Sequence, residues 1–192
     1  MHSSLPEVLE RCRTVFEGVP PFGPLLRERF ADRWLRLSSL PDDRRPPLTA
    51  ADKTELLARQ NLALATLLGD GADCVTSIPV SGGPLRDSQD AERTHLSRLD
   101  GLDGAVVQGW AAPEVDVRRP FQVELARLVF QPGLLDARLL SAAEGRLFGL
   151  VVIGLDQHCA FAPFPGGFDV IAASKTARES LRRRWEAWAP KP

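Results

Sequence analysis

Apolar residues recur along the chain with two different periods. In 4–16 and in 49–68 they recur every three or four positions, which predicts two amphipathic helices. Shorter runs of the same kind predict helices over 24–32 and 132–144. Thr49 is expected to cap the helix over 49–68, since Asp52 follows three residues later in the position of a capping box.

Short apolar runs, alternating or continuous, predict strands at seven places. They are 33–38, 74–80, 105–112, 121–130, 147–155, 159–164 and 168–172. The segment 121–130 alternates with a period of two, although part of it would also suit a helix. Pro79 lacks an N–H and therefore places the strand 74–80 near a sheet edge.

The segment 147–192 has the clearest local architecture. The short connection Asp156 to His158 predicts a hairpin, and a third strand and a helix follow. Ser174 or Thr176 is expected to cap that helix, Thr176 with Glu179 as a capping box. One of its faces carries the apolar residues Ala177, Leu181, Trp185 and Trp188.

These elements predict the fold class. Short hairpin connections imply antiparallel pairing, so the sequence predicts an α+β fold, a mostly antiparallel sheet of about five or six strands with helices packed on it. A C-terminal strand-strand-strand-helix unit completes it. No linker or repeat divides the chain, and we expect a single domain over residues 1–192.

Composition narrows the partners and the compartment. The chain has 44% hydrophobic and 26% charged residues, as globular proteins do, and its net charge of −1 argues against nucleic acid as the main partner. No apolar stretch reaches the roughly 18–20 residues of a membrane span, and the N-terminus lacks the pattern of a signal peptide. Arginine-rich, lysine-poor composition fits a GC-rich bacterial genome.

The cysteines give a further indication of compartment. Cys12, Cys74 and Cys159 are odd in number and far apart, which fits neither a disulfide framework nor a CxxC metal site. We therefore expect a reducing, cytoplasmic location. Three scattered histidines without HxxH spacing argue against zinc, and the chain has no GxGxxG or GxSxG fingerprint. No cofactor and no metal are expected.

Three segments carry a resemblance to a known family. They are 33–45, 55–71 and 160–188. The resemblance as a whole covers about half the chain, and its ends match better than its middle. In that order they resemble a group of uncharacterised bacterial proteins of the DUF3885-like kind, with a Trp-containing strand, a Ser-Leu-Pro turn, an Arg-x-Asn helix and a Tyr-Asp-Gly-Gly-x-Asp turn before a terminal helix. The matching residues are Trp34, Ser39 to Pro41, Arg59, Asn61, Gly166, Gly167, Asp169 and Trp188.

The chain departs from that family pattern at one turn. Phe164 stands in place of the Tyr and Pro165 in place of the first Asp. The loss of that Asp argues against a metal or acid-base role for the turn. The family implies no established activity, so the resemblance supports the fold more than the function.

Two local features invite a functional interpretation. The turn Pro165 to Asp169 exposes backbone N–H groups, and Asp169 could bind a cation or an arginine of a partner; a β-turn that needs glycine is the favoured alternative. His158 and Cys159 are adjacent on a strand, so their side chains point to opposite faces and do not form a dyad.

The absence of a nucleophile-base pair, a metal cluster and a cofactor fingerprint predicts a cytoplasmic, non-enzymatic protein-binding module, of the kind found among immunity proteins of bacterial conflict systems. The alternative is a small enzyme or small-molecule binder whose site is assembled from Arg36, Arg44, Arg45, His158 and Asp169. No catalytic residue is assigned. The candidate binding residues are Trp34, Arg36, Arg44, Arg45, His158, Gly166, Gly167 and Asp169. A deep cleft would favour the alternative, and a flat or apolar face the protein-binding module.

Overall fold

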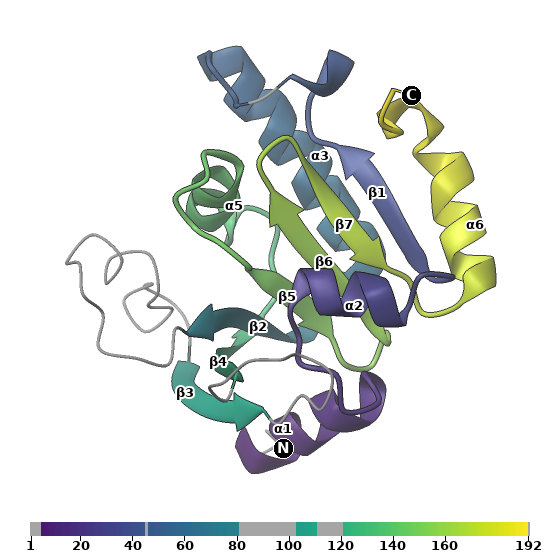
Figure 1. Ribbon diagram of the computed structural model, residues 1–192. Helices are drawn as coiled ribbons and strands as arrows, with labels where there is room; N and C mark the ends of the chain where they lie inside the picture. Colours follow the sequence, from purple (N-terminus) through teal and green to yellow (C-terminus); the bar gives the residue numbers. More distant parts are fainter. Residues whose placement is uncertain (1–4, 45, 81–102, 111–120, 192) are drawn as a thin grey trace.

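A computed structural model describes residues 5–44, 46–80, 103–110 and 121–191 (Figure 1). Its strands form one sheet in which every neighbouring pair is antiparallel, in the order β1-β7-β6-β5-β2-β4-β3. The strands are β1 (Trp34–Ser38), β2 (Asp73–Val80), β3 (Asp103–Trp110), β4 (Phe121–Val129), β5 (Val151–Gly154), β6 (Cys159–Phe164) and β7 (Gly167–Ile171). The predicted α+β class is confirmed. The sheet has seven strands because all seven predicted runs join it.

Helices cover both faces of this sheet (Figure 1). On one face lie α1 (Leu5–Val15) and α2 (Gly23–Arg29), and on the other α3 (Ala50–Leu68), α5 (Asp136–Ala143) and α6 (Lys175–Arg184). Two short 3-10 helices, η1 (Pro41–Asp43) and η3 (Glu186–Trp188), flank α3 and α6. None of the helices within the described ranges is long and apolar enough to cross a membrane.

Strand alternation divides the buried side chains into two cores. On the α3 side Phe161 stacks on Phe168 of the neighbouring strand, with ring centroids 4.9 Å apart. On the α1 side Ala160 and Ile171 belong to a second core that includes Phe16. The side chains of successive residues in β6 and β7 thus point into opposite cores, as the pleat of a strand requires.

Several local predictions are confirmed. Residues 121–129 form a strand, β5 and β6 pair as a hairpin, and Thr49 caps α3 in a complete capping box with Asp52. The expected strand over 105–112 appears as β3, with residues 111 and 112 outside the described ranges.

The prediction that residues 74–80 lie near a sheet edge is wrong. β2 lies inside the sheet, between β5 and β4. Its pairing with β5 stops at Ser77, opposite Val151, whereas its pairing with β4 continues past Pro79. Pro79 therefore has a strand partner on one side only, and this part of β2 resembles an edge strand, where proline is tolerated.

Two element boundaries also differ from the prediction. The run 147–155 forms a strand only from Val151, because Gly149 has a φ of +75° that no extended strand adopts. At the last helix the cap is Ser174, whose hydroxyl accepts a hydrogen bond from the Ala177 N–H at 3.1 Å. The capping box of Thr176 with Glu179 is wrong, because the helix already includes Thr176.

Candidate functional site

Arg36 and Asp169 form an ion pair on the face of the sheet that α2 covers. They are direct partners in the β1–β7 register. The Arg36 Nε donates to Asp169 Oδ1 and its Nη2 to Oδ2, both at 2.8 Å, while the carboxylate is 10% exposed and the guanidinium side chain 36%. This hydrogen bonding raises the pKa of Arg36 above its ordinary value, with burial opposing and the charge of Asp169 adding.

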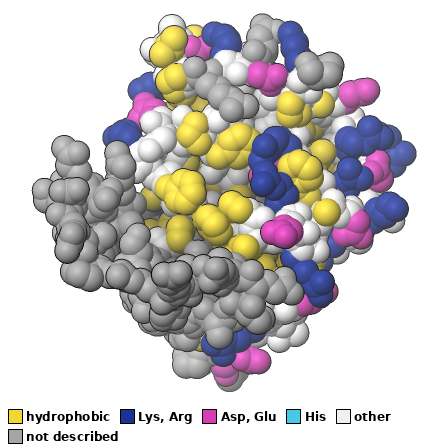
Figure 2. Space-filling model, viewed as in Figure 1, with side chains coloured by type: hydrophobic (Ala, Val, Ile, Leu, Met, Phe, Trp, Pro, Cys, Tyr) yellow, Lys and Arg dark blue, Asp and Glu magenta, His cyan; other side chains and the backbone are white. Residues whose placement is uncertain are grey.

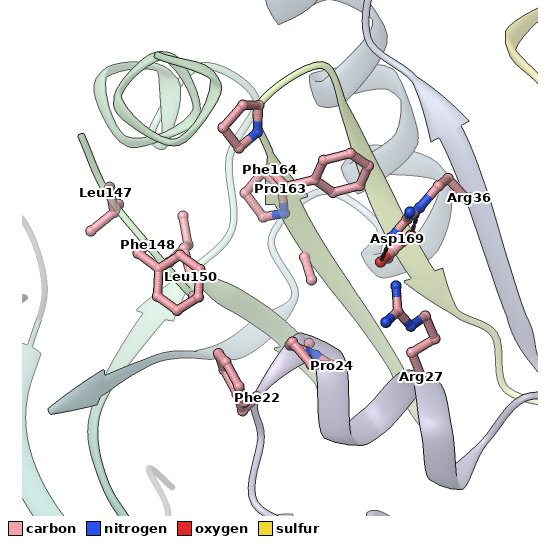
Figure 3. Close-up of a pocket in the computed structure, with 14 residues that line it drawn as sticks. Phe22, Pro24, Arg27, Arg36, Leu147, Phe148, Leu150, Pro163, Phe164 and Asp169 are labelled. Atoms are coloured by element: carbon pink, nitrogen blue, oxygen red, sulfur yellow. Dashed lines mark hydrogen bonds and ion pairs between the residues drawn. The ribbon is translucent and has the colours of Figure 1, made fainter. Parts of the chain in front are cut away.

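Two aromatic rings flank the Arg36 guanidinium. Its carbon lies 4.6 Å from the ring centroid of Phe164 on β6 and 5.5 Å from that of Trp34 on β1. The second ring also receives Arg27 of α2, whose guanidinium carbon is 5.8 Å from its centroid. Two cations, two rings and one carboxylate therefore meet at this place. Figure 3 shows Arg27, Arg36, Phe164 and Asp169 of this group.

All of these groups except Trp34 border an open pocket of about 140 Å³. Figure 3 shows its apolar rim, which comes from three segments: the start of α2, the connection before β5, and the end of β6. Apolar side chains gather on this face of the molecule, with lysine or arginine side chains among them (Figure 2). The rim residues that carry the argument below are Phe22 and Phe148.

The backbone at Gly149 directs Phe148 toward solvent. The φ of Gly149 is +75°, and a Cβ there would lie 2.6 Å from Pro79 Cδ, so only glycine fits. Leu150 turns into the core, whereas Phe148 remains 70% exposed with its ring 5.8 Å from that of Phe22. An exposed phenylalanine is thus held at the pocket rim by a fixed turn.

The start of α2, which packs closely on the sheet, forms the other side of the pocket. Gly23 begins this helix, and a Cβ there would lie 3.2 Å from the Cβ of Ala162 on β6. The helix therefore approaches the strand closely enough for Phe22 and Arg27 to border the same pocket. Sequence reasoning did not find Phe22, Arg27 or Phe148, because helical and strand periodicity alone do not place α2 over β6.

The two glycines of the β6–β7 turn are required by backbone geometry. Gly166 has a φ of +96°, and a Cβ on Gly167 would lie 2.3 Å from the Leu37 carbonyl oxygen on β1. The Gly166 carbonyl accepts a hydrogen bond from the Ser39 N–H at 3.1 Å. Gly166 and Gly167 thus allow β1 to pack against the β6–β7 hairpin, and the adjacent Pro165 borders the pocket.

Two further candidates, His158 and Arg44, lie away from the pocket. His158 occupies the β5–β6 turn with a φ of 51°, and its carbonyl accepts from Arg33 Nη2 at 2.8 Å. Arg44 pairs with Asp52 at the start of α3, with Nη1 and Oδ1 2.8 Å apart. Of the five residues in the enzyme hypothesis, the fold brings Arg36 and Asp169 together, whereas Arg44 and His158 do not border the pocket. Arg45 is outside the described residues.

The Arg-x-Asn pair of α3 holds neighbouring segments in place. Arg59 pairs with Glu55 at 2.6 Å, and its guanidinium carbon lies 5.5 Å from the ring centroid of Trp188. Asn61 donates from Nδ2 to Asp136 Oδ1 at 2.7 Å and accepts from the Gly133 N–H at 2.9 Å. The first residue thus fixes the C-terminal segment, and the second fixes the start of α5.

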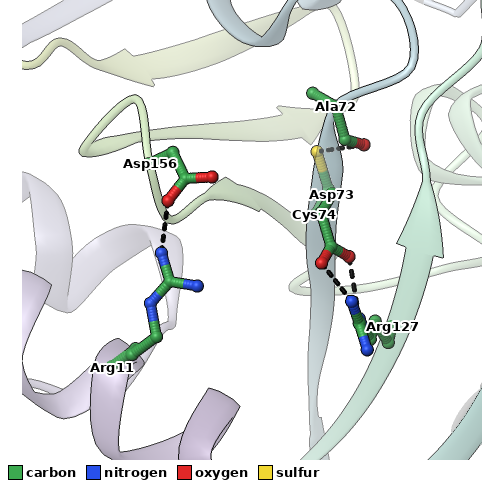
Figure 4. Close-up of polar contacts among 6 residues, drawn as sticks. All are labelled: Arg11, Ala72, Asp73, Cys74, Arg127 and Asp156. Atoms are coloured by element: carbon green, nitrogen blue, oxygen red, sulfur yellow. Dashed lines mark hydrogen bonds and ion pairs between the residues drawn. The ribbon is translucent and has the colours of Figure 1, made fainter. Parts of the chain in front are cut away.

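Other polar contacts of the sheet are also structural (Figure 4). Arg11 of α1 reaches Asp156 in the β5–β6 turn, at 2.5 Å, and Arg127 of β4 pairs with Asp73 of β2. Each joins segments that are far apart in sequence. They lie outside the pocket and leave its charges unchanged.

The three cysteines are poor nucleophiles in this environment. All are buried and unpaired. Burial raises the pKa of Cys12 to about 12, that of Cys74 to about 12 and that of Cys159 to about 11. Each side chain is therefore a protonated thiol at neutral pH, and a thiolate is the form that reacts. Within the described ranges, no three His, Cys, Asp or Glu side chains are grouped to hold a metal ion.

The family model described as Domain of unknown function (DUF3885) matches residues 22–191, nearly the whole chain. The chain belongs to the DUF3885 family. The match extends the resemblance beyond the three segments that carried it, and it contains all residues that line the pocket, from Phe22 to Asp169. Helix α1 precedes it. Comparison with curated proteins and with solved structures gave no match.

Proposed function

We propose that this DUF3885 protein is a non-enzymatic protein-binding module. Its partner docks on the pocket that the start of α2, the connection before β5 and the end of β6 border, called below the face under α2. The supporting observation is Phe148, which is 70% exposed at the rim of a pocket that also contains two arginines. Aromatic and arginine side chains dominate the binding energy of protein interfaces. The fixed turn at Gly149 means that this side chain needs no rearrangement before it binds.

The ionisable groups of the pocket favour binding over catalysis. They are Arg27, Arg36 and Asp169. The Asp169 carboxylate already accepts two hydrogen bonds from Arg36, and a guanidinium does not release a proton at neutral pH. A general base needs a free carboxylate or imidazole within reach of its substrate. These three side chains supply a fixed charge pattern instead.

The compartment belongs to the same proposal. Three buried, unpaired cysteines fit a reducing interior such as the bacterial cytoplasm. The arginine-rich composition fits a bacterial host. We further propose a conflict-system role, in which the partner is a toxin that the protein neutralises; fold class and the lack of catalytic groups support this by analogy.

The second hypothesis, a small-molecule binder, uses the same pocket. Its volume of about 140 Å³ resembles that of an engineered cavity of about 150 Å³ that binds benzene. One ring-sized group would fill it. That group is a partner's side chain in the first hypothesis and a free ligand in the second.

Capture from the native host tests the proposal. The tagged wild-type chain is compared with Phe148→Ser and with Leu48→Ser, a matched change at an apolar residue that is 79% exposed and does not line the pocket. We expect one protein at a stoichiometric amount with the wild type and Leu48→Ser, and its loss with Phe148→Ser. No companion, or a companion that Phe148→Ser retains fully, contradicts the proposal.

A further inference from the structure

The charges of the pocket do not balance. Arg36 is neutralised by the two hydrogen bonds to Asp169. Arg27 is half-buried, borders the same pocket, and forms no ion pair with any residue that the structure describes. Figure 3 shows its guanidinium directed from α2 toward the Arg36–Asp169 pair. Counted over the residues that the structure describes, the pocket lining thus carries one excess positive charge.

We propose that the pocket binds a segment of the partner protein in which a carboxylate side chain adjoins an aromatic one. The carboxylate pairs with Arg27, and the aromatic ring packs against Phe148 and Phe22. This rests on the proposed function and adds the chemistry of the partner to it. The carboxylate comes from an Asp or Glu, because an acidic side chain is the group of a protein segment that a lone guanidinium complements.

The surroundings of Arg27 favour an anion of single charge. Its guanidinium carbon lies over the Trp34 ring, 5.8 Å from the ring centroid, which leaves the planar N–H fork for an acceptor. Phosphorylated segments are bound by clusters of arginines. Here the second arginine is already paired with Asp169, so the described residues offer one unpaired cation at the pocket, among apolar walls.

The size of the pocket determines which partner side chain lies beside the carboxylate. About 140 Å³ holds one benzene-sized group. The rings of Phe22 and Phe148 are tilted by 59° with centroids 5.8 Å apart, and a third ring can add to such a pair edge-to-face. A phenylalanine of the partner fits both the volume of the pocket and the arrangement of these two rings.

Two peptides test the charge directly. Acetyl-Gly-Phe-Asp-Gly-amide and acetyl-Gly-Phe-Asn-Gly-amide differ only in the carboxylate, and 3-phenylpropionate serves as a free small acid. Each is titrated into the full chain and followed by backbone amide NMR shifts. We expect the Asp peptide to bind with a millimolar Kd, about tenfold more tightly than the Asn peptide, and to shift amides at the pocket.

Two variants locate the effect. Arg27→Gln should bring the Asp peptide to the affinity of the Asn peptide, whereas Arg183→Gln, the same charge change at an exposed residue of α6, should leave the tenfold preference intact. Equal binding of the two peptides, no binding at millimolar concentration, or an equal loss in both variants overturns the proposal. Binding of 3-phenylpropionate alone also overturns it, in favour of a small acid as the ligand.

The outcomes separate this inference from the proposed function. A captured companion that depends on Phe148 but binds Arg27→Gln as well as the wild type would leave the docking surface in place and overturn the carboxylate. Asp-selective peptide binding without any captured companion would support the chemistry of the pocket and contradict the protein-binding module.

Discussion

Arg36 and Asp169 are 133 residues apart in sequence and meet in register across β1 and β7, joined by two hydrogen bonds of 2.8 Å. The pair fixes the first strand of the fold to its last. It also supplies two of the charged groups of the candidate site, beside Arg27, since all three residues border the pocket. The same two side chains therefore join the strands and border the proposed binding site.

Replacing Arg36 should lower the free energy of unfolding more than replacing Asp169. Arg36→Met leaves a carboxylate that is 10% exposed without its partner, and we expect a loss of about 2 kcal/mol in the free energy of unfolding. Asp169→Asn leaves a guanidinium that water still reaches, and we expect a loss of about 1 kcal/mol. Urea denaturation measures both.

A surface ion pair provides the control for that comparison. Arg29 and Glu17 are 2.5 Å apart, with both side chains more than half exposed. Arg29→Met should change stability by no more than about 0.5 kcal/mol. If Arg36→Met proved as mild as this control, the Arg36–Asp169 pair would not hold β1 to β7.

Gly167→Ala should be among the most destabilising single changes at a glycine. The added Cβ would lie 2.3 Å from the Leu37 carbonyl oxygen, and backbone cannot move aside as a side chain can. We expect a loss of about 3 kcal/mol or more, and thermal unfolding measures it. At Gly18 the φ is +80° but no atom lies within 4 Å of an added Cβ, so Gly18→Ala should cost about 1 kcal/mol. Equal losses would refute the steric explanation.

Asn61 should tolerate Ala better than Asp. Asn61→Ala removes the hydrogen bonds to Asp136 and Gly133, for an expected loss of about 1–2 kcal/mol. Asn61→Asp places a second carboxylate where the Asp136 Oδ1 is 2.7 Å from the present amide nitrogen, and like charges repel. Adding Asp136→Asn to Asn61→Asp should restore most of the stability. A double variant no more stable than Asn61→Asp would contradict this account.

Stability should fall in acid through Asp52. The Thr49 N–H is the main cause of its lowered pKa, the Thr49 hydroxyl, the Leu48 N–H and Arg44 also lower it, and burial opposes them. A pKa that folding lowers contributes stability above the unfolded value, and that stability is lost as pH falls through the folded value. The loss therefore begins near the usual value of 3.8 and continues below it.

The difference between the wild type and Asp52→Asn should accordingly be largest at pH 7 and vanish in strong acid. Urea unfolding at pH 7, 5, 4 and 3 measures it. Asp32→Asn serves as a control, since Asp32 is exposed and forms no ion pair within the described ranges. A difference that stayed constant from pH 7 to pH 3 would mean that the Asp52 carboxylate does not stabilise the helix start.

Local elements of this fold could be predicted because their signals are local. The β5–β6 hairpin follows from a short connection between apolar runs, and the cap at Thr49 from two residues three apart. The start of β5 could not be predicted, because the apolar residues on both sides of Gly149 look like one continuous strand. The turn at Gly149 follows from its contact with Pro79, which is distant in sequence. The interior position of β2 depends on where the distant strand β5 begins.

The site could be predicted in part for the same reason. Arg36 and Asp169 were both candidates, yet their pairing depends on a register between strands 133 residues apart. The family pattern pointed to Gly166 and Gly167, whose roles are conformational. Arg27 gave no signal, because it is one charged residue of a short predicted helix. Phe148 gave none, because it lies in an apolar run that predicts a strand.

The affinity of the purified companion for the wild type, Phe148→Ser and Leu48→Ser tests the central claim most directly, by isothermal titration calorimetry. The account predicts that Phe148→Ser raises the Kd at least about tenfold, as loss of an interface aromatic does, while Leu48→Ser leaves it unchanged. Equal Kd values for all three proteins, each confirmed as folded, would contradict the claim that the partner docks on the face under α2.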